Sequence, residues 1–262
     1  MLRFSLQRFM IDISMIPVTV QKGLTMKYAL ITGCDHGLGL ALASELLSRG
    51  YYTVACRLNP GEQQIDALCH SFPEQSEIHT LDISKDDSVT QLKEDTGHLP
   101  CLDLLINCAG ILGVMENSPE EPLDFDRMLS VINVNAVGTL RVTSALLPLV
   151  EKSQDKTILN ISSEAGSIQD CWRKGWFGYC MSKSANNMQG TLIHNWLRSK
   201  GGQVIQMHPG HVATFMRGHL DLTATVTPAA SAKGILKTVL DQSLPVRDIP
   251  LYLDYTGKEL RY

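Results

Sequence analysis

The feature that most constrains this chain is a repeated alternation between short apolar runs and longer stretches with helical spacing. Strands separated by helices pair in parallel, and strands covered on both faces are apolar throughout. The sequence therefore predicts an α/β fold with a doubly wound, mostly parallel seven-stranded sheet, helices on both faces and a single domain. The predicted strands are 28–32, 52–56, 78–81, 102–106, 157–161, 204–207 and 250–253, and the predicted helices are 38–49, 62–71, 86–96, 124–151, 178–200 and 229–242.

The composition is that of an ordinary globular protein, with 44% hydrophobic and 19% charged residues. A net charge of -4 without a Lys/Arg cluster argues against a nucleic-acid partner. No stretch approaches the roughly 18 to 20 apolar residues that cross a bilayer, so we expect no membrane partner. The seven cysteines form no CxxC pair, which favours reduced thiols in a cytoplasmic protein.

Residues 1–25 differ from the rest of the chain. Arg3, Arg8 and Asp12 interrupt their apolar residues, so no signal-peptide core is present. Met26 directly precedes the first predicted strand. We expect 1–25 to be a poorly ordered extension or a mis-assigned start, with a docking arm or targeting segment as the alternative, and 26–262 to form the domain.

A glycine-rich turn follows the first predicted strand. It reads Thr32-Gly33-Cys34-Asp35-His36-Gly37-Leu38-Gly39 and leads directly into a helix. Glycines let the backbone turn tightly and approach a pyrophosphate, while the start of the helix offers that anion unpaired N–H groups. At the first strand–helix junction of an alternating chain, this turn predicts a Rossmann-type dinucleotide site.

The residue after the second strand bears on the choice of dinucleotide. An acid at this position binds the ribose of NAD, whereas Arg57 stands here and can pair with the 2′-phosphate of NADP. His36 lies in the nearby turn and can assist. Asp35 acts in the opposite direction, because a carboxylate near the phosphate is repulsive. NADP(H) is therefore favoured, with NAD(H) as the alternative.

Tyr179 and Lys183 lie four residues apart in a predicted helix, so both side chains point to one face. An ammonium beside a phenol favours the phenolate, and we expect it to lower the tyrosine pKa toward neutrality. Such a tyrosine can give a proton to a carbonyl oxygen or take one from an alcohol. YxxxK alone is a common accident, but three further motifs accompany it: Ser162-Ser163-Glu164-Ala165-Gly166, Asn107-Cys108-Ala109-Gly110 and Asn133-Val134-Asn135-Ala136-Val137-Gly138.

With these motifs in order, the chain resembles the classical short-chain dehydrogenase/reductase family along nearly its full length from Met26. Within it the chain is most similar to the C-factor-like and sniffer-like carbonyl reductases, judged from its long Ser-to-Tyr interval and its closing Leu253-Asp254-Tyr255-Thr256-Gly257-Lys258-Glu259.

The resemblance implies a role for each matching position. Tyr179 would be the acid/base, Lys183 would lower its pKa and bind the nicotinamide ribose, Ser163 would bind the substrate oxygen, and Asn135 would hold a water in a proton relay. The cofactor-binding residues would be Gly33, Asp35, His36, Gly37, Leu38, Gly39, Arg57, Asp82, Ile83, Asn107, Ala109, Gly110, Tyr179, Lys183, Pro209, Gly210, Val212 and Thr214.

The chain departs from the family pattern at two places. Cys108 replaces the usual second asparagine of NNAG, which removes polar contacts from the centre of the sheet. The interval from Ser163 to Tyr179 is 16 residues rather than the common 13, so the loop between them must bulge. The Trp172-Arg173-Lys174-Gly175-Trp176-Phe177 stretch in this loop is predicted to form a wall of the site, with binding of an acidic substrate as the alternative.

The remaining features give weaker signals. The 211–227 segment has neither helical nor strand period and follows a strand, which is typical of a substrate loop. No histidine pair forms HxxxH or HExxH, so we expect no metal, and no base accompanies Cys171 or Cys180.

The sequence thus predicts hydride transfer between NAD(P)(H) and a small carbonyl or alcohol, in a homodimer or homotetramer. A nucleotide-binding sensor without turnover is the alternative. An extended-type epimerase or dehydratase fits less well, because its TGxxGxxG turn and larger C-terminal region are missing.

Overall fold

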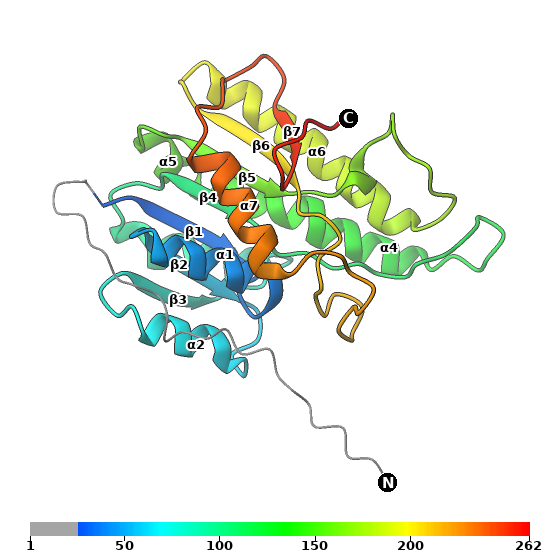
Figure 1. The fold of residues 1–262 in the computed structure, drawn as a ribbon, viewed down its shortest axis with the longest axis horizontal. Coiled ribbons are helices and arrows are strands. Elements are labelled where there is room, and N and C mark those ends of the chain that lie inside the picture. The colour runs from blue at the N-terminus through cyan, green and yellow to red at the C-terminus, as the bar shows by residue number, and fades with distance from the viewer. Residues whose placement is uncertain (1–25) are drawn as a thin grey trace, which may run out of the picture.

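Seven strands, all parallel, form one sheet in the order β3-β2-β1-β4-β5-β6-β7 in the computed structural model, which describes residues 26–262 (Figure 1). The predictions for residues 1–25 lie outside the described residues. The predicted fold class is confirmed, with a sheet that is wholly parallel. The strands are β1 (Tyr28–Thr32), β2 (Tyr52–Arg57), β3 (Ser76–Thr80), β4 (Leu104–Asn107), β5 (Thr157–Ile161), β6 (Gln203–His208) and β7 (Leu251–Asp254).

The starts of two strands differ from the prediction by two residues, each for a local reason. β3 begins at Ser76, two residues early, because this edge strand is mostly polar and only half-buried, so hydrophobicity does not mark its start. β4 begins at Leu104 rather than Leu102. Leu102 is fully buried, but its N–H donates to Leu149 O, 3.0 Å away, rather than to a neighbouring strand.

Helices cover both faces of the sheet (Figure 1). Successive strand residues alternate between two hydrophobic clusters: Ala29 and Ile31 pack with α1, α2 and α7, whereas Leu30 packs with α3, α5 and α6. The helices are α1 (Gly37–Ser48), α2 (Gln63–His70), α3 (Asp86–Asp95), α4 (Phe125–Ile132), α5 (Thr139–Lys152), α6 (Phe177–Arg198) and α7 (Pro228–Leu240), with the 3₁₀ turns η2 (Thr96–His98) and η4 (Glu164–Gly166).

The prediction of a single helix over 124–151 is wrong in one respect. A π-helical segment, η3 (Asn133–Gly138), separates α4 from α5. A π turn inserts one residue into the hydrogen-bond ladder and so rotates the side chains that follow. The apolar period is too coarse to reveal one extra residue. The π turn bears on the candidate site, because η3 carries Asn135.

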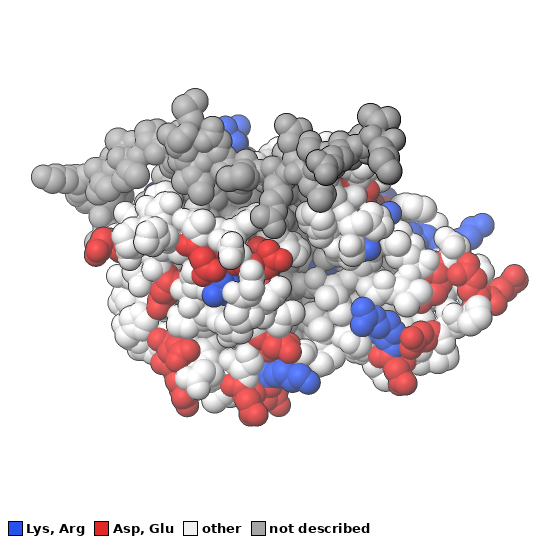
Figure 2. Space-filling model, turned by 90° about the horizontal axis from the view of Figure 1, so that it is seen from below, with Lys and Arg blue, Asp and Glu red and all other residues white. Residues whose placement is uncertain are grey.

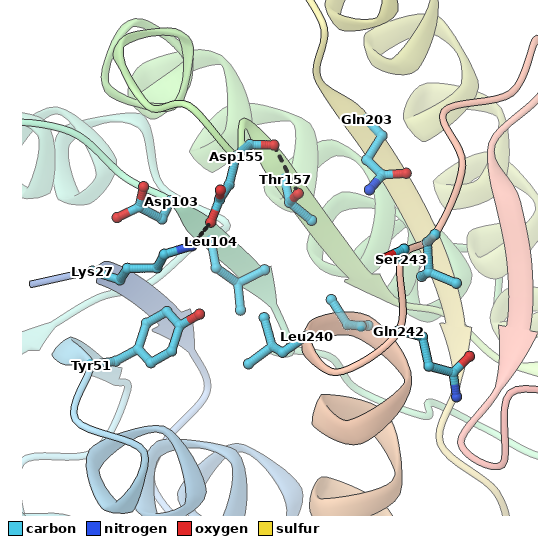
Figure 3. A pocket seen from close by; sticks show the side chains of 12 residues that line it. Lys27, Tyr51, Asp103, Leu104, Asp155, Thr157, Gln203, Leu240, Gln242 and Ser243 are labelled. Carbon is cyan, nitrogen blue, oxygen red and sulfur yellow. Dashed lines mark hydrogen bonds and ion pairs between the residues drawn. The ribbon is translucent and has the colours of Figure 1, made fainter. Parts of the chain in front are cut away.

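A cavity of about 280 Å³ lies at the amino ends of β1, β4, β5 and β6 (Figure 3). Lys27 reaches across it and pairs with Asp155, with 2.5 Å between Nζ and Oδ2. Tyr51, Asp103 and Gln203 also line it. In open α/β sheets, ligands bind beyond the carboxyl ends of the strands. The cavity is at the opposite edge, so the site must be sought at the other end of the sheet.

Candidate active site

The carboxyl ends of five strands bring the predicted site residues to one edge. The register pairs Thr32 with Cys56, Asn107 with Asn160 and Ile161 with Met207. The residues that follow these strand ends are therefore neighbours in space, although they are far apart in the sequence. Gly33, Arg57, Cys108, Ser162 and Pro209 all lie at or just beyond this edge.

The glycine-rich turn is as tight as the sequence predicts. Gly33 has a φ of +77°, and a Cβ there would lie 2.8 Å from the Cα of Ala109. A Cβ on Gly39 would lie 2.1 Å from the carbonyl oxygen of Gly33. Thr32 joins the turn to the next strand end, since its Oγ1 accepts from the N–H groups of Cys108 at 3.0 Å and Ala109 at 3.1 Å. These contacts place the first turn of α1 at the edge of the sheet.

The start of α1 fits an anion. Its N-cap is His36, which makes no side-chain cap hydrogen bond, and its first turn contains no acidic residue. Among residues 26–262, the first N–H groups of the helix therefore have no side-chain acceptor, and the helix dipole favours negative charge there. The His36 ring lies instead against Phe215, with 6.0 Å between ring centroids. Leu38 behind the turn is buried in the core.

At the end of β2 the two charged candidates have partners within the chain. The Asp35 carboxylate accepts from the N–H groups of Leu58 at 3.0 Å and Asn59 at 2.6 Å, so it closes the loop after β2. The Arg57 guanidinium turns toward α2, where its Nη1 pairs with Asp66 Oδ2 at 2.6 Å. Its Nε is buried without a partner among the described residues. The structure thus places Asp35 and Arg57 at the same strand end, with opposite charges.

The candidate catalytic side chains of Ser163, Tyr179 and Lys183 lie close together between β5 and α6. Ser163 follows β5 as the N-cap of η4, and its Oγ accepts from Ala165 N at 3.2 Å. Tyr179 and Lys183 lie one turn apart on α6, with Lys183 Nζ 5.6 Å from the centroid of the Tyr179 ring. Lys183 Nζ donates to the carbonyl oxygen of Ile161 at 2.9 Å. Each of the three side chains is less than a tenth exposed.

The pKa of Tyr179 differs from the value expected from the sequence. Burial raises the pKa of Tyr179 to about 12, against the opposing effect of a hydrogen bond with the Ser163 side chain. Burial also lowers the pKa of Lys183 to about 8. The predicted lowering of the tyrosine pKa by Lys183 is wrong for this structure, because desolvation disfavours the charged form of both groups. Tyr179 is therefore a protonated phenol at neutral pH, the form that can donate.

Asn135 joins three parts of the site through its side chain. Its Oδ1 accepts from Ile111 N at 2.8 Å, while its Nδ2 donates to Ile111 O at 2.8 Å and Ser182 Oγ at 2.9 Å. Both amide N–H groups are thus used. The side chain ties η3 to the loop after β4 and to α6. Its role in holding a water stays a prediction.

The other cofactor candidates form the walls around this centre. Asn107 donates to Thr143 and Asn160, and Asp82 accepts from Ser84, so both stabilise strand ends. Ile83 packs against Gly138, and a Cβ on Gly110 would lie 3.1 Å from Asn135 Oδ1. Ala109 lies against Gly33, as given above. These residues lie around the edge as predicted, and their contacts with a cofactor stay predictions.

Comparison with known proteins identifies the family. The sequence pattern of the short chain dehydrogenases matches residues 27–224. The chain belongs to the short-chain dehydrogenase family. It is 31% identical over 201 residues to the mouse short-chain dehydrogenase/reductase family 9C member 7, covering 75% of this chain and 61% of that protein. The chain spans about three fifths of the length of the mammalian relatives it matches.

Other relatives are matched over most of their length. A Rhodococcus 1-hydroxy-2-glutathionyl-2-methyl-3-butene dehydrogenase is 29% identical over 82% of this chain and 91% of its own. The NADPH-bound carbonyl reductase from chicken fatty liver superposes with a TM-score of 0.79 at 30% identity, covering 91% of this chain and 95% of that one. The Drosophila melanogaster carbonyl reductase Sniffer gives 0.82 at 25% identity, covering 91% and 100%. The predicted resemblance to carbonyl reductases is confirmed.

The loop between Ser163 and Tyr179 bulges beside the Tyr179 ring. Trp176 adopts a φ of +61° at the N-cap of α6, and its ring meets the Tyr179 ring edge-on at 6.4 Å between centroids. Arg173 lies over the Trp176 ring at 5.1 Å and pairs with Glu164 at 2.5 Å. The cationic–aromatic stretch therefore forms a wall beside the Tyr179 ring.

Glu116 also supports this wall, and sequence reasoning missed it. It is 2% exposed, its Oε2 accepts from Phe177 N at 3.2 Å, and its carbonyl oxygen accepts from Trp176 N at 3.0 Å. A carboxylate at the start of α6 also suits the helix dipole. Glu116 lies 61 residues before the start of α6 in the sequence, so no local pattern connects it with that helix.

The 211–227 segment is irregular, as expected, and lies against the glycine turn. A Cβ on Gly37 would meet Thr214 Cγ2 at 3.2 Å. Val212 bridges to Val226, and the buried Asp221 carboxylate pairs with His211 at 2.9 Å and with Arg217 at 3.3 Å. These partners and Thr223 hold the pKa of Asp221 well below its usual range. Pro209 is held by Ser231, and Gly210 lies against Tyr255.

Residues 26–262 contain neither a membrane-spanning helix nor a metal-type cluster of side chains. No helix in this range is both long and apolar enough to cross a membrane. Within the same range, no group of three or more His, Cys, Asp or Glu side chains has the arrangement of a metal site. On the face drawn in Figure 2, acidic and basic side chains are interspersed over the described surface.

Proposed function

We propose that this protein is an NAD(P)H-dependent carbonyl reductase or alcohol dehydrogenase, formed by residues 26–262. The observation that carries the proposal is the buried Tyr179 phenol, with Ser163 and Lys183 around it, at the sheet edge that also holds the glycine turn and the uncapped start of α1. Membership of the short-chain dehydrogenase family supports the same reaction. The sensor alternative has no need for a phenol in this setting.

The chemistry divides between the cofactor and the side chains. A bound nicotinamide dinucleotide supplies a hydride for reduction and accepts one in oxidation. Tyr179 Oη donates its proton to the carbonyl oxygen of the substrate, and the reverse transfer serves alcohol oxidation. Ser163 Oγ orients the same oxygen. Lys183 Nζ, held by Ile161 O, completes the polar side of the site.

NADP(H) is the favoured cofactor in this proposal, with NAD(H) possible. The NADPH-bound chicken relative and the presence of Arg57 after β2 support it. The ion pair of Arg57 with Asp66 and the carboxylate of Asp35 weaken the preference, because a 2′-phosphate competes with one and is repelled by the other.

The substrate is a small carbonyl or alcohol with an apolar body. Leu112 and Ala165 pack with Tyr179 in a small hydrophobic cluster, and Met115, Trp176 and Cys180 lie against it. The 211–227 loop would cover the substrate from the other side. Names of relatives such as human retinol dehydrogenase 16 and human 17-beta-hydroxysteroid dehydrogenase type 6 are consistent with apolar alcohols.

The assay that tests this proposal is oxidation of NADPH and of NADH by the purified chain with a panel of aldehydes and ketones. Turnover with at least one carbonyl compound is expected, faster with NADPH. Tight binding of both dinucleotides without any turnover across the panel would favour the sensor alternative.

We also propose a cytoplasmic homodimer or homotetramer. Leu129 and Phe125 on α4 and Met181 on α6 are exposed around an apolar hollow of about 340 Å³, and Leu192 and Trp196 continue the stripe along α6. An exposed apolar stripe of this kind marks a protein interface. Sedimentation should give a dimer or tetramer, and Leu192→Glu should shift it toward monomer, whereas the exposed Lys174→Glu should not.

A further inference from the structure

A buried polar cluster lies behind Ser163, and the reaction proposed above makes no use of it. Its members come from three elements: Ser162 after β5, Asn187 on α6 and Tyr252 on β7. Each is at most 4% exposed, and Tyr252 is among the largest fully buried side chains. Polar groups are seldom buried without a hydrogen-bonding purpose, because burial alone costs free energy.

The cluster holds the backbone that carries the catalytic serine. The Tyr252 hydroxyl donates to the carbonyl oxygen of Ser163. Ser162 Oγ donates to Asn187 Oδ1 at 2.6 Å, and Asn187 Nδ2 donates to Gly166 O at 3.2 Å. The turn from Ser162 to Gly166 is therefore tied at its start by β7 and at its end by α6.

These ties set the position of Ser163 relative to Tyr179. Asn187 lies one turn beyond Lys183 and two turns beyond Tyr179 on the same helix, so the helix that carries the acid/base also holds the serine turn. Only χ1 separates the backbone of Ser163 from its Oγ. A small rotation of the Ser163 peptide therefore moves the hydroxyl relative to the phenol, and catalysis is sensitive to such shifts.

Tyr252 is itself held by the last two residues of the described chain. The rings of Tyr252 and Tyr262 lie 5.0 Å apart between centroids, and the Tyr262 hydroxyl donates to Pro250 O at 3.0 Å. Tyr262 O accepts from Gln169 N at 3.0 Å, and Arg261 forms an ion pair with Asp170. Both partners belong to the loop between Ser163 and Tyr179.

We propose that Tyr252 is a positioning residue that acts through Ser163: its hydroxyl, donating to the Ser163 carbonyl oxygen, fixes the serine turn for proton transfer at Tyr179. The inference rests on the proposed function, because it assigns the effect to the serine of that reaction. It extends the site by a residue 89 positions away in the sequence.

Tyr252→Phe tests this directly, because it removes the hydroxyl and keeps the ring. The Ser163 carbonyl oxygen retains its bond from Gly166 N, so the fold should survive. We expect kcat to fall about 3- to 10-fold, the scale of one neutral hydrogen bond, with the NADPH dissociation constant within twofold. The matched control is Tyr52→Phe, which removes a tyrosine hydroxyl at the amino end of β2, away from the site, and should leave kcat unchanged.

A double-mutant cycle separates positioning from general support. If Tyr252 acts through Ser163, then Tyr252→Phe should lower the residual turnover of Ser163→Ala by less than twofold. An equal fall in both backgrounds would overturn the proposal, as would an unchanged kcat in the wild-type background. A parallel loss of NADPH affinity would show that Tyr252 merely supports the fold.

Amide hydrogen exchange provides a readout independent of turnover. Faster exchange of the Gly166 N–H in Tyr252→Phe is expected, because that N–H bonds the same Ser163 carbonyl oxygen. Unchanged exchange there would contradict the proposal even if the protein turned over no carbonyl compound. If Tyr252→Phe fails to fold, Tyr262→Leu removes the stacked ring instead and should give the same non-additive loss with Ser163→Ala; additive loss would overturn it.

Discussion

The two ends of the proposed dinucleotide site are built in opposite ways. At the catalytic end, Tyr179, Ser163 and Lys183 are each less than a tenth exposed, and burial shifts the pKa of both ionisable groups. At the β2 end, Arg57 and Asp35 are partly exposed, and each is bonded to residues that follow β2 in the chain. Charge is costly at the first end and easily rearranged at the second. Substitutions should therefore act mainly on rate at one end and on cofactor choice at the other.

The largest expected effect is at the catalytic end. Tyr179→Phe removes the transferable proton and little else, so turnover should fall about 10²- to 10⁴-fold. The NADPH dissociation constant should stay within a few fold, because the ring remains. Steady-state kinetics and equilibrium binding on the same preparation check both expectations. Activity within a few fold of the wild type would disprove the acid/base role.

The second prediction tests the β2 end. An arginine–phosphate contact is worth about 1.5–3 kcal/mol, or about 10- to 150-fold in affinity. The wild type should therefore bind NADPH more tightly than NADH, and Arg57→Asp should invert that order while leaving kcat with saturating cofactor nearly unchanged. Dissociation constants of both cofactors for both proteins decide the matter. Equal binding of NADH and NADPH by the wild type would contradict the role of Arg57.

The third prediction concerns the free-energy cost of burying the Lys183 ammonium. Lowering the Lys183 pKa from 10.5 to about 8 corresponds to about 3 kcal/mol at about 1.4 kcal/mol per pKa unit. Lys183→Met removes that cost but leaves Ile161 O without its donor, at about 1–2 kcal/mol. The free energy of unfolding of the variant should therefore be about 1–2 kcal/mol higher than that of the wild type at pH 7. The variant should also lose turnover.

The pH dependence of this difference has a definite sign. The folded wild type binds fewer protons at Lys183 than the unfolded chain between about pH 8 and 10.5, so its stability rises with pH across that window. The advantage of Lys183→Met should be complete below pH 8 and shrink above it. Denaturant unfolding at pH 7 and pH 10 measures it. An advantage that is equal at both pH values would show that the lysine charge is not the cause.

The contrast between the two ends also explains what the sequence could predict. The glycine turn, Tyr179 and Lys183 follow local spacings that have a physical reason, whereas the role of Ser163 follows from the family resemblance. The partners of Asp35 and Arg57 depend on how loops fold back, which local spacing does not encode. Glu116 and Tyr252 act over 61 and 89 residues, and the π turn at Asn135 hides within a regular apolar period.

The smallest predicted effect concerns the ion pair between Arg57 and Asp66 at the β2 end. If the Asp66 pair holds Arg57 away from a 2′-phosphate, then Asp66→Asn should free the guanidinium and tighten NADPH binding. The Asp66 side chain is 45% exposed, and pairs near the surface are worth about 0.2–1 kcal/mol, so the gain should be about 1.5- to 5-fold. NADH binding should not change, because it has no 2′-phosphate.

The matched control is Asp87→Asn, which removes an exposed carboxylate on α3 and the same net charge. Titrations at low and at physiological salt should show the gain shrinking with ionic strength, as for any exposed pair. An equal gain for NADH, or for the control, would mean that overall charge, rather than release of Arg57, governs affinity at this end.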